Sequence, residues 1–121
     1  MDFDELVSMV RNNRVAELEA FFDSSDERSF SVNSVDPRTG NSLLLVACQN
    51  GNKRVVKMLL RRGAALNHRN NRGNSCLHFA YFFGFTELGE YLISKGADDS
   101  KRNSEGLTCY EGVSRSSLEA L

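Results

Sequence analysis

The stretch GNSCLHFA at residues 73–80 has a relative 33 residues earlier, where the chain reads GNSLLLVA at residues 40–47. When residues 40–72 are aligned with residues 73–105, 11 of the 33 positions are identical. The glycines follow the same period: Gly40, Gly73 and Gly106 form one series, Gly51 and Gly84 a second, Gly63 and Gly96 a third. Self-similarity of this kind indicates an array of one repeated supersecondary unit.

Local signals divide each unit into a turn followed by two helices. The glycine that opens each copy supplies the positive φ of a tight turn. Ser42, Ser75 and Thr108 stand where a hydroxyl can cap a helix. Gly51 and Gly84 suit the left-handed residue that ends one. Together with the apolar spacing, these signals predict helices over residues 43–50, 53–62, 76–83 and 86–95.

The period and its punctuation resemble the ankyrin repeat. Residues 73–80 are similar to the family's Gly-x-Thr-Pro-Leu-His-x-Ala, and LISKGAD follows at residues 92–98. Residues 13–22 resemble the second helix of a divergent first copy, and residues 106–111 open another unit. The resemblance covers nearly the whole chain and implies an all-α solenoid of about three to four stacked helix-turn-helix units, joined by β-turn or hairpin loops.

The expected organisation is a single ankyrin-repeat domain over residues 1–121. Its units are a divergent N-terminal unit (1–36), two repeats (37–69 and 70–102) and an incomplete C-terminal capping unit (103–121). A polar insertion at residues 23–36 is expected on an exposed loop. The resemblance implies that His78 hydrogen-bonds between adjacent turns, whereas His68 is expected to be an exposed turn residue.

Composition narrows the class of protein. The chain has 121 residues, of which 40% are hydrophobic and 26% charged, as in a folded globular domain. It has no apolar run long enough for a membrane span, and its three cysteines lack the spacing of a zinc site. Motifs for phosphate binding, a nucleophile elbow or a zinc protease are absent. We therefore expect a non-enzymatic protein without cofactor or metal, cytoplasmic or alternatively nuclear.

The charge of the chain is segregated along the sequence. The total is −1, but residues 1–36 carry −6, residues 37–86 carry +8 and residues 87–121 carry −3. The basic segment favours an acidic partner, although the bases within 53–62 could equally form a solvated helix face. Binding of nucleic acid or acidic lipid through residues 37–86 is one alternative, and the acidic flanks count against it. Self-association, with the acidic first unit docking on another copy or with end-to-end stacking, is a second.

The resemblance also implies a binding surface, the concave face made by turn tips and inner helices. Phe82 and Phe83 precede Gly84 and are expected there as apolar anchors, with packing inside the chain as the alternative. The partner-binding candidates are Arg38, Asn41, Gln49, Arg69, Asn71, Arg72, Asn74, Phe82, Phe83 and Arg102. The expected function is that of a protein-protein interaction module, a scaffold or adaptor, for a partner with an acidic and apolar surface.

Overall fold

The computed structural model describes residues 2–24 and 30–112. Within these ranges the chain forms six helices and no strand longer than an isolated bridge. They are α1 (Phe3–Arg11), α2 (Val15–Asp23), α3 (Leu43–Asn50), α4 (Lys53–Arg61), α5 (Cys76–Phe82) and α6 (Thr86–Ser94).

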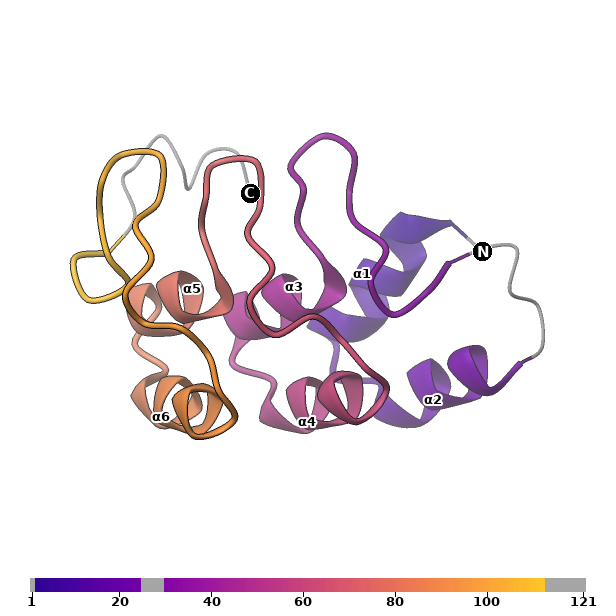
Figure 1. Cartoon of the computed structure of the whole chain (residues 1–121). Coiled ribbons are helices and arrows are strands. Elements are labelled where there is room, and N and C mark those ends of the chain that lie inside the picture. Colours follow the sequence, from indigo (N-terminus) through magenta and orange to yellow (C-terminus); the bar gives the residue numbers. More distant parts are fainter. Residues whose placement is uncertain (1, 25–29, 113–121) are drawn as a thin grey trace.

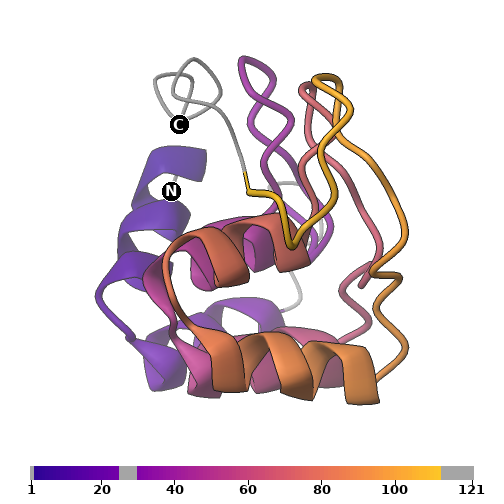
Figure 2. The same ribbon diagram turned by 90° about the vertical axis from the view of Figure 1, so that its left-hand side faces the viewer.

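The six helices form three antiparallel pairs that stack side by side (Figure 1). The first helices of the pairs, α1, α3 and α5, make one layer, and α2, α4 and α6 make the other. Turn loops project from the same side of the stack, and Figure 2 shows that they stand upright beside the α5 layer, giving an L-shaped cross-section. This arrangement confirms the expected all-α repeat solenoid.

Helices α3, α4, α5 and α6 begin where the sequence predicts, and α2 covers most of the segment that resembles a second helix. α3 has the predicted bounds, whereas α4, α5 and α6 each begin at the predicted residue and end one residue earlier. The hydroxyls of Ser42 and Ser75 accept hydrogen bonds from the amides of Leu45 and His78, three residues on, as predicted for N-caps. The amide and hydroxyl of Thr108 instead donate to Glu111 in a turn. The rest of the predicted capping unit, from residue 113, lies outside the described residues.

The N-terminal unit is a complete helix pair, α1 and α2, that packs on the next pair. The predicted insertion at 23–36 is only partly an exposed loop. Its residues 25–29 lie outside the described residues, but Phe30 packs edge-on against Phe3, with ring centroids 5.7 Å apart. Val32 also packs against the core, and Val35 forms a bridge with Ser42. The apolar residues of this segment therefore help to join the first unit to the array.

One apolar core runs through all three helix pairs. The middle helix α3 lies between α1 and α5, and its residues from Leu43 to Cys48 are all buried. This position explains why residues 43–50 are apolar almost all round instead of striped. The outer helix α4 shows the striped pattern, with Val55, Val56 and Leu59 buried and the cationic side chains exposed.

Ion pairs join the acidic first unit to the basic second unit. Arg62 lies 2.7 Å from Asp23, Arg61 lies 3.5 Å from Glu19, and Arg38 lies 3.5 Å from Asp4. These pairs are largely exposed, so each contributes about 0–1 kcal/mol to stability. They also engage Asp4, Glu19 and Asp23 within the chain. These three carboxylates belong to the acidic unit that self-association would dock on another copy.

Candidate functional site

A ladder of buried asparagine side chains fixes the turns that carry the candidate residues. The Asn70 amide donates to the Asn41 side-chain oxygen at 2.8 Å, and the Asn103 amide donates to Asn74 at 2.8 Å. The Asn70 oxygen accepts from the backbone amides of Arg72 and Asn74, which closes the turn. Each link joins residues 29 apart, so the ladder couples neighbouring repeats.

This ladder corrects two of the candidate binding residues. Asn41 is 5% exposed and Asn74 is fully buried, so neither side chain can reach a partner. The sequence prediction placed them on the binding surface because the resemblance implies that the turn tips contact partners. The amide side chain that covers each of them comes from the next repeat, 29 residues away.

His78 performs the predicted structural role. Its Nδ1 accepts from the Ser75 amide at 3.2 Å, which completes a capping box. This bond leaves Nε2 to donate to the Leu107 carbonyl, 2.9 Å away in the next turn. His68 departs from its prediction, because it is half-buried and its Nε2 lies 2.7 Å from the Gly40 carbonyl. Both imidazoles therefore link turns of neighbouring repeats.

The burial of His78 predicts a pH-dependent stability. Burial lowers the pKa of His78 below its ordinary value of 6.5, because the charged ring loses its hydration there, and the nearby charge of Arg69 lowers this pKa further. The stabilisation is therefore present above pH 6.5 and is lost as pH falls through the lowered pKa. We expect the free energy of unfolding in urea to fall below pH 6.5 in the wild type, and less so in His78→Gln. Parallel pH profiles for the two proteins would contradict this assignment.

Five of the candidate residues gather around the turn tips, where they line two adjoining cavities. The first, of about 420 Å³, is lined by Arg38, Thr39, Asn70, Asn71, Arg72 and Ser104. The second, of about 500 Å³, is lined by Arg69, Asn70, Asn71, Gly73, Arg102, Asn103 and Ser104. We call the residues of both cavities the tip site. Its three turns are tied together by the amides of Asn71 and Ser104, which donate to the carbonyls of Thr39 and Arg72 at 2.9 Å.

The arginines of the tip site differ in how far they are engaged. Arg38 contacts both carboxylate oxygens of Asp36, whose pKa is lowered chiefly by these hydrogen bonds. Arg102 lies 3.3 Å from Glu111, and its guanidinium also donates to the Gly106 carbonyl. The tip site thus combines cations with many hydrogen-bond donors, and no acidic residue lines either cavity.

The predicted aromatic pair lies at the opposite end of α5 from its turn. Phe82 and Phe83 are 38% and 39% exposed, and their rings pack edge-to-face with centroids 5.2 Å apart. Tyr81 is half-buried beside Gly89 and Tyr110. Gln49 on the neighbouring helix α3 is also half-buried, and its side-chain nitrogen has no hydrogen-bond partner among the described residues.

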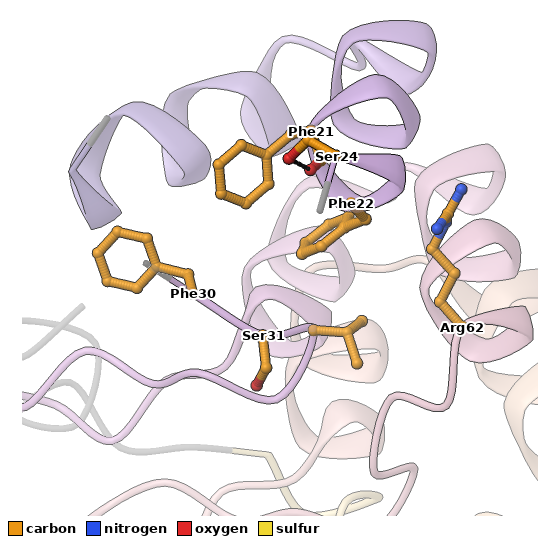
Figure 3. Close-up of a pocket in the computed structure, with 7 residues that line it drawn as sticks. Phe21, Phe22, Ser24, Phe30, Ser31 and Arg62 are labelled. Carbon is orange, nitrogen blue, oxygen red and sulfur yellow. Dashed lines mark hydrogen bonds between the residues drawn. The ribbon is translucent and has the colours of Figure 1, made fainter. Parts of the chain in front are cut away.

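Two features were not singled out from the sequence. The ammonium groups of Lys53, Lys57 and Lys95 lie 5.0–5.6 Å from the centre of the Tyr91 ring on the outer helices. An apolar cavity of about 420 Å³ lies beside α2, and Figure 3 shows the rings of Phe21, Phe22 and Phe30 around it with Arg62 at its side. The aromatic residues of 21–30 were the only signal for this cavity. We assign this cavity no ligand.

The described residues hold no group of three or more histidine, cysteine, aspartate or glutamate side chains placed to bind a metal. A hydrogen bond with Cys76, together with burial, raises the pKa of the Cys48 thiol, and burial raises the pKa of Cys109 to about 11. Both thiols are therefore protonated at neutral pH. In the same part of the chain, every helix is too short to cross a bilayer.

Comparison with known proteins supports the repeat architecture. A family model described as ankyrin repeats (3 copies) matches residues 6–103. Mouse protein phosphatase 1 regulatory subunit 27 is 35% identical over 79 residues, which cover 65% of this chain and 51% of that protein. The chain thus spans about half the length of this relative.

Two further relatives differ in length. The human Notch-regulated ankyrin repeat-containing protein is 35% identical over 86 residues, covering 71% of this chain and 75% of that protein. BRCA1-associated RING domain protein 1 of Caenorhabditis elegans is 36% identical over 107 residues, covering 88% of this chain but 14% of that protein. The repeated helix pairs, the histidine and asparagine links between their turns and these matches lead to one conclusion: the chain belongs to the ankyrin repeat family.

Proposed function

We propose that this chain is a non-enzymatic adaptor, cytoplasmic or nuclear, that binds a partner protein through its turn tips and inner helices. Ankyrin repeats are general protein-protein interaction modules. The observation that carries the proposal is the tip site, where Arg38, Arg69, Arg72 and Arg102 line cavities free of acidic residues. An acidic surface of the partner would complement these cations.

The exposed pair Phe82 and Phe83 supports an apolar contact on the same partner. The aromatic pair lies at the far end of α5, whose seven residues span about 10 Å, so a partner that contacts both regions must extend along this helix and up the turn. Burying one phenylalanine fully contributes about 1.5–3 kcal/mol, whereas an exposed ion pair contributes about 0–1 kcal/mol. We therefore expect the aromatic pair to set the affinity and the arginines to set the orientation and the association rate.

Affinity capture from a native lysate tests this proposal. We expect both Phe82→Ala/Phe83→Ala and Arg69→Ala/Arg72→Ala to lose a protein that the wild type captures. The matched control, Arg54→Ala/Lys57→Ala, removes the same charge from the outer helix α4 and should keep it. Circular dichroism should show equal helicity in all four proteins.

Three outcomes would contradict the proposal. If the aromatic and tip variants capture the same partners as the wild type, the binding surface lies elsewhere. If only the α4 control loses partners, the basic outer helix is the interface. Nucleic acid that is captured and released by salt would favour an electrostatic function of residues 37–86 instead.

A further inference from the structure

The positive charge of the tip site is only partly paired with acidic side chains of the described residues. Arg38 and Arg102 pair with carboxylates. Across residues 2–24 and 30–112, however, neither Arg69 nor Arg72 lies within ion-pair distance of an acidic side chain. Both are exposed, and Arg69 has one hydrogen bond, to the Arg102 carbonyl at 3.3 Å. The charge of Arg69 contributes to the lowered pKa of Asp98, but no ion pair holds either guanidinium group among the described residues.

The two cavities of the tip site form one continuous donor surface. They share Asn70, Asn71 and Ser104, and the turn from Asn70 to Gly73 lies between them. Guanidinium groups, the Asn71 amide and the hydroxyls of Thr39 and Ser104 supply the donors. The amides of Asn70 and Asn103 are buried in the ladder. The engaged arginines keep unused N–H groups, because a guanidinium carries five. Arg38 binds Asp36 and Asp4 through Nε and one terminal nitrogen, which leaves its other terminal nitrogen available.

A carboxylate and a phosphorylated side chain differ in their charge and in the number of oxygens they offer to the arginine N–H groups. A carboxylate brings one negative charge and two oxygens. A phosphorylated side chain brings about −1.5 to −2 charges and three strong acceptor oxygens. Two unpaired guanidinium groups match the phosphorylated side chain in charge, and the planar fork of arginine matches phosphate oxygens in geometry.

We propose that the tip site binds a phosphorylated serine, threonine or tyrosine of the partner protein, with Arg69 and Arg72 as its principal ligands. This inference rests on the proposed function, because it names the chemical group that the partner presents to the turn tips. It makes partner binding conditional on phosphorylation, with the aromatic pair contacting apolar residues beside the phosphorylated one.

Degenerate peptide libraries test the inference, because they sample many partner sequences at once. The probes are four fluorescent libraries with the same random flanks and a fixed centre of phosphoserine, phosphothreonine, phosphotyrosine or serine, together with glutamate and paired-glutamate versions. We expect one phosphorylated library to bind about tenfold or more tightly than its unphosphorylated and glutamate counterparts, as for the loss of a charge-assisted hydrogen bond. Fluorescence anisotropy at moderate salt measures the binding.

Variants locate the site. Arg72→Gln and Arg69→Gln should each weaken phosphopeptide binding about tenfold. Arg72→Lys, which keeps the charge but loses the planar fork, should weaken it as well. The matched control Arg54→Gln on α4 should bind like the wild type. Equal binding of serine, glutamate and phosphorylated libraries would overturn the inference, as would loss of binding in Arg54→Gln alone.

Other anions provide a second check. Inorganic phosphate, a phosphoinositide vesicle or RNA that binds as tightly as the best phosphopeptide library would overturn recognition of a phosphorylated protein. The lysate experiment separates this inference from the function on which it rests. If phosphatase treatment releases no partner and Phe82→Ala/Phe83→Ala still abolishes capture, the phosphoryl inference fails and the adaptor function stands. If every variant keeps every partner, both fail.

Discussion

Phe79→Ala should lower the free energy of unfolding by about 3–5 kcal/mol, the usual cost of emptying a fully buried phenylalanine site. Phe79 has no exposed surface and is among the largest fully buried side chains of the chain. It lies on α5, which packs against both α3 and α6. Because repeats are stable only against their neighbours, a cavity in α5 weakens the array on both sides. Urea denaturation followed by circular dichroism measures the change.

The matched controls for this prediction are the two phenylalanines at the C-terminal end of α5. Phe82→Ala and Phe83→Ala remove the same side chain from positions that are 38% and 39% exposed. We expect each to cost about 1 kcal/mol, because their rings lose less buried area. The conservative Phe79→Leu should lower the free energy of unfolding by an amount between those of Phe79→Ala and the two exposed variants. If Phe82→Ala or Phe83→Ala lowers the free energy of unfolding as much as Phe79→Ala does, these rings belong to the core. They could then not serve as apolar anchors for a partner.

Gly51→Ala should lower the free energy of unfolding by about 2–5 kcal/mol through two separate effects. Gly51 has φ +67°, a conformation in which a side chain costs about 1–2 kcal/mol. An added Cβ would also stand 2.7–2.8 Å from three atoms of the Phe85 ring. Such overpacking adds about 1–3 kcal/mol.

Gly84 is an internal control for the second effect. It occupies the equivalent position one repeat later, with φ +81°, but an added Cβ there would meet no atom within 4 Å. Gly84→Ala should therefore show the conformational cost alone. The difference in unfolding free energy between the two variants measures the contact with Phe85. If the two variants are equally stable, the Phe85 ring moves aside without cost and the predicted clash is wrong.

The relative stability of these variants also bears on the binding experiments. Phe82, Phe83, Arg69 and Arg72 are exposed, so their substitution should change binding while leaving the helix content intact. Substitution of Phe79 or Gly51 should instead lower the helix content and the stability. A variant of either core position that loses partners would report unfolding and not the interface.

Local features of the sequence were sufficient to predict α3, α4, α5 and α6 and their turns, whereas α1 was not predicted. A glycine with positive φ and a serine cap act within three or four residues, so Gly51, Ser42 and Ser75 mark their helix ends independently of the rest of the chain. Because the same signals recur every 33 residues, they also predicted that the helix pair is repeated along the chain. The starts of α3, α4, α5 and α6 could be predicted on this basis, whereas the fold class and the structural role of His78 followed from the resemblance to the ankyrin repeat.

The environment of individual side chains depended on contacts between repeats. Asn41 and Asn74 have the polar character of surface residues, yet amide side chains 29 residues away bury them. His68 is half-buried because a carbonyl 28 residues earlier lies within hydrogen-bond distance. The position of Phe30 against Phe3 likewise depended on how the first unit returns to the array.

By itself, the sequence determined the repeat, its helices and the accumulation of cations at the turns, because each is set by neighbouring residues or by composition. Only the tertiary structure decided which cations remain unpaired, which asparagines are buried and which aromatic rings reach the surface. The physical reason is that burial and charge compensation are properties of pairs. Arg38 and Arg72 are both turn-tip arginines, but Arg38 finds Asp4 on α1 and Arg72 finds no acidic partner among the described residues.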